Sequence, residues 1–293
     1  MTLPAFELLQ PESLDEALKL LGETPEAVPI AGGTCLLVDL RERKTSADVL
    51  LDLSRIEALR RIEIVGDELL IGATVTIAEI LDDPSVAAYA GVLREACKTF
   101  AAPLIRNRAT IGGNLAHASP AADTAPPLLL LDAMVEIQAD GRKRVAPLHR
   151  FFAGPCDTTL KPAHLLTAVR IPIPEGAPRW TYQKIRLRKA DAISVVSAAA
   201  LAAPSKDGPP EVRIALGAVA PTPIRAWDAE ETLKGGKLTP EAITVAAKVA
   251  AEEARPIDDL RGSAEYRRRE IEVLVRRCLS GLMSSNGGEA DGA

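Results

Sequence analysis

The sequence has few aromatic residues and no excess of positive charge. Phe, Trp and Tyr make up 3% of its 293 residues, and the formal net charge is −5. Proteins that bind nucleic acids commonly combine stacking aromatic side chains with a basic surface. The composition therefore argues against a nucleic-acid-binding protein.

Cysteine and histidine are also scarce, and neither is clustered. No C-x-x-C pair occurs, so the spacing gives neither a zinc site nor an iron–sulfur motif. We expect no metal in this chain, and we expect the cysteines to be reduced thiols, mostly buried. The residues concerned are Cys35, Cys97, Cys156, Cys278, His117, His149 and His164.

Long apolar runs are absent too. No stretch reaches the roughly 18 apolar residues of a membrane helix, since Asp132 and Glu136 interrupt "PPLLLLDAMVEI". The first residues, "MTLPAFELLQPESLDEAL", lack the basic start and apolar run of a signal peptide. We therefore expect a protein without a membrane span, located in the cytoplasm.

What is present is a globular pattern, with 47% hydrophobic residues. Residues 13–22 predict a helix with Ser13 as N-cap, Glu16 completing a capping box and Gly22 as the stop. "AVPIAGGTCLLVDLRER" predicts a strand, a Gly-Gly turn and a helix, and "ADVLLDL" predicts a further strand. This alternation indicates a small parallel βαβ subdomain over about residues 1–58.

The pattern changes over about residues 59–176. Gly66-Asp67 and Asp140-Gly141 each separate two alternating runs and predict hairpins. "TAPPLLLLDA" predicts a buried helix, and "HLLTAVRIPIP" a strand. The two subdomains would form one domain, residues 1–176. Proline and glycine in "PIPEGAPRW", residues 172–180, suggest the boundary to a second domain of three strands and two helices, residues 177–283, followed by a flexible tail, residues 284–293.

Two glycine segments share one chemical character, "PIAGGT" at 29–34 and "TIGGN" at 110–114. Adjacent glycines let backbone N–H groups approach an anion closely, and a helix predicted after the first segment would favour a phosphate there. The alternative is two ordinary turns. Neither segment matches the dinucleotide or Walker P-loop motifs, so the residues alone leave both a diphosphate cradle and a structural role open.

The segments "AGGT" and "RNRATIGGNLAHASPAAD" resemble those of the FAD-binding medium subunits of molybdenum hydroxylases, the carbon monoxide dehydrogenase and xanthine dehydrogenase flavoproteins. "LLIGATVT", "FFAG", "HLLTAVRIP", "YQKIRLRKA" and "RGSAEYRRR" agree in order, so the resemblance covers about residues 3–281. It implies an α+β fold: a vanillyl-alcohol-oxidase-type (PCMH) FAD-binding domain of two α/β subdomains, and a C-terminal α+β domain with a small antiparallel sheet and helices.

The resemblance also implies that FAD is bound non-covalently. One side of its diphosphate would lie against Pro29, Ile30, Ala31, Gly32, Gly33, Thr34, Cys35 and Leu36, and the other against Thr110, Ile111, Gly112, Gly113 and Asn114. Phe100 and Leu166 match positions beside the flavin ring, Asp123 an acid that meets polar parts of the cofactor, and Lys184 a cation near the isoalloxazine. The resemblance implies no catalytic residue in this chain.

Other interpretations of four of these residues stay open. Phe100 and Leu166 can be core residues, Lys184 can lie on a solvated strand face, and Asp123 can cap the helix that begins in "DTAPP". The arginines of "YRRR", Arg267 to Arg269, suit a solvated or subunit-facing surface.

The resemblance to this family also implies partner subunits. A large molybdopterin-containing subunit would oxidise the organic substrate, and a small 2Fe–2S subunit would pass electrons to FAD, in a dimer of heterotrimers. FAD would deliver them to a quinone, NAD or O2. The alternatives are a free-standing FAD-dependent oxidase and a scaffold subunit without flavin.

Overall fold

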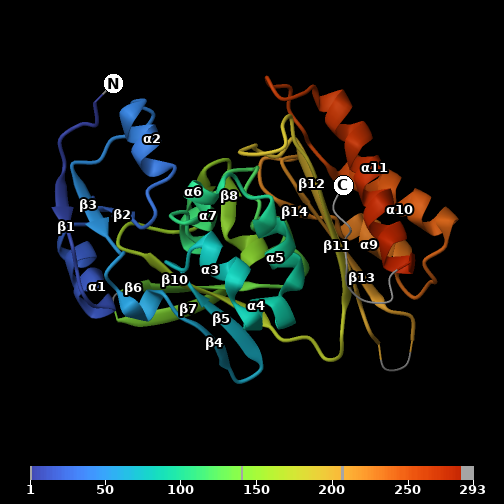
Figure 1. The fold of residues 1–293 in the computed structure, drawn as a ribbon, viewed down its shortest axis with the longest axis horizontal. Helices are drawn as coiled ribbons and strands as arrows, with labels where there is room; N and C mark the ends of the chain where they lie inside the picture. Colours follow the sequence, from blue (N-terminus) through green and yellow to red (C-terminus); the bar gives the residue numbers. More distant parts are fainter. Residues whose placement is uncertain (1, 140, 206–207, 285–293) are drawn as a thin grey trace. The chain divides into compact units, whose positions relative to one another are not determined.

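The computed structural model describes residues 2–139, 141–205 and 208–284. Its chain forms two compact units (Figure 1). The first comprises the described residues of Met1–Ala90, Cys97–Ser119 and Leu131–Ile173, and the second those of Gly91–Ala96, Pro120–Leu130 and Pro174–Ala293. The predicted boundary near residue 176 stays a prediction, and the predicted tail lies outside the described residues except for Ser284.

The first unit begins with a parallel three-stranded sheet in the order β1-β3-β2. Its elements are β1 (Glu7–Leu9), α1 (Leu14–Glu23), β2 (Val28–Ile30), α2 (Leu36–Arg41) and β3 (Val49–Asp52). The Ser13 hydroxyl caps α1 by accepting from the N–H of Glu16. Two expectations about this helix are wrong. Gly22 does not stop it, since the helix runs on to Glu23, and the Glu16 carboxylate accepts from the N–H of Glu12 instead of Ser13.

The second sheet of this unit is antiparallel, in the order β4-β5-β10-β6-β7. Gly66, at φ +64°, closes the β4–β5 hairpin, and Gly141, at φ +68°, lies just before β7. Both hairpins form where the sequence predicts them, although Asp140 itself lies outside the described residues. The strands are β4 (Ile62–Val65), β5 (Glu68–Gly72), β6 (Met134–Ala139), β7 (Arg142–Pro147) and β10 (Leu165–Pro172), with a separate pair of β8 (Phe152–Gly154) and β9 (Asp157–Thr158).

Short helices follow β5. They are α3 (Ile77–Asp82), α4 (Pro84–Tyr89), α5 (Gly91–Lys98), α6 (Pro103–Arg106) and α7 (Ile111–His117). Asp83 and Pro84 begin α4, because the Asp83 carboxylate caps the helix and proline is suited to its first turn. The interpretation of "TIGGN" as an ordinary turn is wrong. Thr110 is the N-cap of α7, and both glycines lie in its first turn.

The second unit is built on an antiparallel four-stranded sheet, β11-β12-β13-β14. The strands are β11 (Arg179–Ile185), β12 (Val196–Ala203), β13 (Glu211–Gly217) and β14 (Ile224–Arg225). The helices are α8 (Ala125–Leu130), α9 (Trp227–Leu233), α10 (Pro240–Glu253) and α11 (Ala264–Ser284). Residues 91–96 of α5 also belong to this unit. In Figure 1, α9, α10 and α11 lie along one side of this sheet. The sequence predicted the strands β11 to β13 and the helices α8, α10 and α11, but neither β14 nor α9.

Small side chains let these layers pack closely. Ala198, Ala200 and Ala202 of β12 belong to one buried cluster with residues of α9, α10 and α11. Gly217 of β13 lies against α8, because a Cβ there would be 2.8 Å from Cγ of Pro126. Every residue of α8 is buried, as predicted for this apolar run. None of the described helices is long and apolar enough to cross a membrane.

A buried arginine anchors the start of α11. The side chain of Arg267 is only 2% exposed, donates to Asp259 at 2.6 Å and also to the carbonyl of Ala218 at 2.8 Å. Asp259 accepts from Arg261 as well, at 2.7 Å. The interpretation of "YRRR" as a solvated surface is therefore wrong for Arg267, although Arg268 and Arg269 are exposed.

Asp259→Ala is expected to lower the free energy of unfolding by roughly 3 kcal/mol, because it leaves the buried Arg267 without its carboxylate. Burial acts to raise the pKa of Asp259, but Arg261 and Arg267 outweigh it and hold that pKa well below its usual range. Such a group adds stability above its unfolded pKa of about 3.9 and loses it as the pH falls further. The difference between wild type and variant, measured by urea unfolding, should therefore shrink as the pH falls from about 5 to about 3.

Glu265→Ala is the matched control for this substitution. Glu265 also pairs with an arginine, Arg269, but both side chains are more than half exposed, and exposed pairs contribute little. Equal destabilisation by the two substitutions would contradict the role assigned to Asp259.

Candidate functional site

The two glycine segments lie next to each other in the first unit. A Cβ on Gly32 would come within 1.9 Å of the carbonyl oxygen of Arg108 and 3.1 Å of the Cα of Ala109. Only glycine allows this approach of backbone to backbone. The chain at 31–33 therefore runs against the residues that directly precede Thr110.

The second segment is also fixed from its other side. The N–H of Ile111 donates to the carbonyl of Val75 at 3.0 Å, and that of Gly112 to the carbonyl of Ala73 at 2.9 Å. Thr76 and Thr110 form an isolated antiparallel bridge. The stretch "LLIGATVT" thus holds "TIGGN" in place, and three of the stretches that carry the family resemblance meet here.

The two segments differ in what their backbone offers. Within the part of the chain that the structure describes, no protein acceptor binds the N–H groups of residues 31–36. These six residues are partly or fully exposed. A run of open N–H groups is the feature by which a backbone binds an anion, so this segment fits a phosphate group.

In the second segment the N–H groups are already used. Besides the bonds of Ile111 and Gly112, the N–H of Gly113 donates to the Thr110 hydroxyl at 3.1 Å, and that of Asn114 to the Thr110 carbonyl at 2.9 Å. Gly113 is nevertheless exposed and Asn114 partly exposed. Among the described residues, open N–H groups are therefore found in the first segment and not at residues 111–114 of the second, and binding of a diphosphate by either segment stays a prediction.

Gly33 gives the first segment its shape. Its φ of +70° is in the left-handed region, where a β-branched residue is strained. A Cβ at this position would also come within 3.1 Å of the Leu37 side chain and 3.2 Å of the Ile30 side chain. The orientation of the peptide groups around Gly33 thus depends on the absence of a side chain.

Two of the four cysteines are exposed and two are buried. Cys35, in the glycine segment, and Cys156 are exposed, whereas Cys97 and Cys278 are buried, and all four are free thiols. The expectation of mostly buried thiols therefore holds for two of them. Burial raises the pKa of Cys278 to about 12, and partial burial with nearby Asp39 raises the pKa of Cys35.

Phe100 and Leu166 are both buried in the first unit, with 9% and 5% of their surface exposed. Phe100 lies between α5 and α6, and Leu166 is on β10 where a register shift interrupts its pairing with β6. Both are core residues of this chain. Contact with a flavin ring stays a prediction for each.

Asp123 and Lys184 form a buried ion pair in the second unit. The Lys184 ammonium donates to Oδ2 of Asp123 at 2.6 Å, with side chains 2% and 8% exposed. Oδ1 of Asp123 accepts from the hydroxyl of Ser194 at 2.7 Å. Two alternatives are therefore wrong: Lys184 is not on a solvated face, and the Asp123 carboxylate binds two side chains instead of capping α8.

The electrostatics of this pair follow from its burial. Desolvation raises the pKa of the Asp123 carboxyl, whereas Lys184, the Ser194 hydroxyl and the charge of Arg186 act to lower it. Each member of the pair offsets the other's charge where water is excluded. Loss of either one would leave an uncompensated buried charge.

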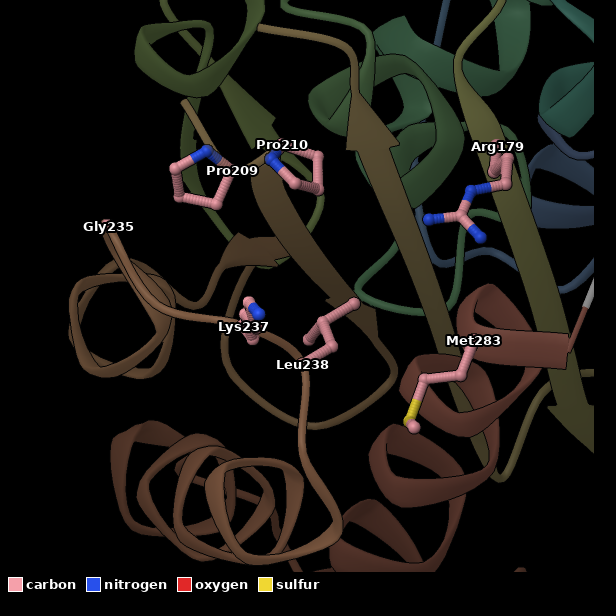
Figure 2. Close-up of a pocket in the computed structure, with 7 residues that line it drawn as sticks. All are labelled: Arg179, Pro209, Pro210, Gly235, Lys237, Leu238 and Met283. Atoms are coloured by element: carbon pink, nitrogen blue, oxygen red, sulfur yellow. The ribbon is translucent and has the colours of Figure 1, made fainter. Parts of the chain in front are cut away.

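The pocket shown in Figure 2 is separate from the predicted site residues. It is a depression of about 560 Å³ in the second unit, lined by the apolar Pro209, Pro210, Leu238 and Met283 with the basic Arg179 and Lys237. None of the predicted site residues lines it. Among the described residues, no group of three or more His, Cys, Asp and Glu side chains is placed to hold a metal ion.

Three residues of these networks were not predicted: Ser194, Asp259 and Arg261. Ser194 follows the quoted stretch "YQKIRLRKA" within ten residues, and Arg261 opens "RGSAEYRRR". Their positions beside family motifs were the only available signal. The partners of Ser194 are distant in sequence, Asp123 by 71 positions and Arg261 by 67, so these contacts could not be inferred. Asp259, in contrast, is only two positions from Arg261 and eight from Arg267.

Comparison with known proteins covers nearly the whole chain. Residues 4–174 match the family described as the FAD binding domain in molybdopterin dehydrogenase, and residues 180–282 match the CO dehydrogenase flavoprotein C-terminal domain. The nicotine 6-hydroxylase medium subunit of Paenarthrobacter nicotinovorans is 35% identical over 280 residues, which is 95% of this chain and 98% of that protein. The carbon monoxide dehydrogenase medium chain of Hydrogenophaga pseudoflava is 33% identical over 278 residues, 94% of this chain and 96% of that one.

A solved structure agrees with these matches. A chain of the carbon monoxide dehydrogenase from Hydrogenophaga pseudoflava, in a form that lacks the Mo-pyranopterin moiety of its molybdenum cofactor, has a TM-score of 0.93 at 33% identity. The match covers 97% of this chain and 99% of that chain.

Proposed function

Because the chain belongs to the FAD-binding medium subunits of the molybdenum hydroxylase family, we propose that it receives electrons from the 2Fe–2S clusters of a partner subunit and passes them to a terminal acceptor, which is a quinone, NAD or O2. The match of two successive flavoprotein domains over nearly the full length carries this proposal. When bound, FAD supplies the exchange between single-electron and two-electron carriers.

The first glycine segment would bind the cofactor diphosphate. Its open N–H groups from Ala31 to Leu36 would donate to phosphate oxygens, with Pro29 and Ile30 leading into the segment. Thr110 to Asn114 would form the neighbouring wall, because Gly32 packs directly against the chain that precedes Thr110. Within this wall the exposed Gly113 and partly exposed Asn114 are the residues open to a ligand.

The remaining site residues would act on the ring system. Phe100 and Leu166 would exclude water from it with an aromatic and an aliphatic surface. Lys184 would stabilise negative charge on the reduced ring, and Asp123 would hold that lysine and meet polar parts of the cofactor. No residue of this chain is proposed to contact the organic substrate.

The proposed partners are a large molybdopterin-containing subunit and a small 2Fe–2S subunit, arranged as a dimer of heterotrimers. The names of several relatives, medium chain or medium subunit, support the presence of larger and smaller partners, and the dimer of heterotrimers is part of the proposal. We place the complex in the cytoplasm.

The full-length protein, purified and then denatured, is expected to release one FAD per chain, identified by chromatography and mass. Release without proteolysis shows that the cofactor is held non-covalently. A colourless protein that takes up no added FAD would contradict cofactor binding by this chain.

A second measurement tests the electron route. Co-expression with the genes for the proposed large and small subunits should give a complex whose FAD is reduced when the iron–sulfur clusters are reduced. A chain that stays alone and oxidises a substrate directly would instead favour a free-standing oxidase.

A further inference from the structure

The side chain of Ser194 is a buried hydroxyl group that donates a hydrogen bond to one charged acceptor, the Asp123 carboxylate. The residue has no exposed surface, and its hydroxyl donates to Oδ1 of Asp123 at 2.7 Å. The other carboxylate oxygen, Oδ2, binds Lys184 at 2.6 Å. Ser194 and Lys184 therefore each donate a hydrogen bond to a different oxygen of the same carboxylate.

The backbone of Ser194 is anchored separately. Arg261 donates to the Ser194 carbonyl at 3.3 Å, and the same guanidinium binds Asp259 at 2.7 Å. Asp259 in turn accepts from the buried Arg267 at 2.6 Å. Two arginines of the stretch "RGSAEYRRR" thus help to fix the position of Ser194: Arg261 binds its carbonyl, and Asp259 joins Arg261 to the buried Arg267.

We propose that Ser194 is a positioning residue for the redox site: by binding Oδ1 of Asp123 it sets how strongly that carboxylate neutralises Lys184, and so tunes the potential of the bound FAD. The inference rests on the proposed role of Lys184 beside the flavin. It assigns the Asp259–Arg261 cluster the task of keeping Ser194 in place.

The direction of the effect follows from competition for one carboxylate. A hydrogen bond to a charged acceptor is stronger than a neutral one, so the hydroxyl takes up part of the capacity of Asp123 to bind Lys184. Without this hydroxyl, Lys184 is the only hydrogen-bonding partner of the carboxylate that the structure gives, and the carboxylate neutralises the ammonium more completely. Less positive charge is then left to stabilise the reduced ring, and the potential falls.

Other charges that face Asp123 are few. Two cations act on the Asp123 carboxylate: Lys184, on β11, and Arg186, which directly follows this strand. Its second hydrogen-bonding partner beside Lys184 is Ser194. Arg186 is partly exposed and is unchanged in the experiment below. The response therefore reports on Ser194 and the ion pair.

The test is the two-electron potential of bound FAD in full-length protein, measured by spectroelectrochemistry at constant pH. Ser194→Ala is expected to lower the equilibrium constant for reduction roughly threefold, about 14 mV for a two-electron couple. The same substitution is then made in an Asp123→Asn/Lys184→Met background, in which both charges are removed together so that no lone buried charge remains. In this background, Ser194→Ala is expected to leave the two-electron potential of bound FAD unchanged.

Ser197→Ala is the matched control. Ser197 is also buried, at 1% exposure, and lies opposite Lys184 in the β11–β12 register, but the hydroxyl that binds Asp123 is that of Ser194. It is expected to leave the potential unchanged in both backgrounds. The comparison separates loss of a buried hydroxyl in general from loss of the contact to Asp123.

The outcomes separate the two proposals. An unchanged potential in Ser194→Ala, or an equal shift in both backgrounds, overturns the positioning role while leaving FAD binding intact, because independent effects add. A wild-type protein that binds no FAD overturns the proposed function, and this inference with it.

Discussion

Gly33→Val is expected to abolish retention of FAD by the purified protein. The position has φ +70°, where a β-branched side chain is strained by about 1–2 kcal/mol. Relief of that strain must rotate the neighbouring peptide groups. The N–H groups of residues 31–36 would then no longer point toward one anion. The measurement is FAD content per chain after gel filtration, with the dissociation constant for added FAD as a second readout.

Two variants control for strain and for side-chain size. Gly66→Val imposes the same substitution at φ +64° in the β4–β5 turn, where an added Cβ meets no atom within 4 Å. Gly66→Val should lower the free energy of unfolding by an amount similar to that for Gly33→Val, yet the protein should still bind FAD. Gly33→Asn should retain more FAD than Gly33→Val, since Asn tolerates the left-handed region. Full occupancy in Gly33→Val would show that this segment does not hold the diphosphate.

Lys184→Met and Asp123→Asn are expected to move the potential of bound FAD in opposite directions. The first removes the cation and leaves a buried carboxylate, which disfavours negative charge on the reduced ring, so the potential falls. The second leaves the ammonium without its carboxylate, so the potential rises. A change of 1.4 kcal/mol corresponds to about 30 mV for a two-electron couple, and we expect shifts of at least this order, measured by equilibration with redox dyes.

The pair also affects folding, so each variant needs a stability measurement beside its potential. Removing one member of a buried pair costs roughly 3–5 kcal/mol, whereas Asp123→Asn/Lys184→Met should be closer to wild type in both stability and potential. Asp191→Asn, in an exposed pair with Arg188, should change neither quantity. Shifts of the same sign in both single variants would mean that charge at this pair does not reach the flavin.

Local signals in the sequence predicted much of the fold. Turn residues such as Gly66 determine their hairpins through their own backbone angles, and Ser13 caps the helix that it precedes. The helix at 111–117 was missed because its two glycines have low helix propensity. Its start is stabilised by bonds to Ala73 and Val75, and such distant partners are not visible in a local pattern.

The family, the α+β fold class and FAD as cofactor, which rested on the resemblance, are confirmed by the comparisons. The geometry of the candidate site was much less accessible. Asp123 and Lys184 were both named, but their direct pairing spans 61 residues and left no trace in either local segment. Arg267 looked like one member of a solvated basic run. Its partner Asp259 lies only eight residues earlier, but the run itself carries no sign that this carboxylate folds back onto the arginine.

The discontinuity of the two units limits how this polypeptide can be divided. The backbone changes unit after residues 90, 96, 119, 130 and 173, so α8 is assigned to the second unit although it precedes most of it by more than 40 positions. Cleavage in the proline-rich connection near residue 175 would leave α8 on one fragment and β12 and β13, against which it packs, on the other. Each fragment would then expose apolar surface to water, and efforts to produce a minimal flavin module should retain the entire polypeptide.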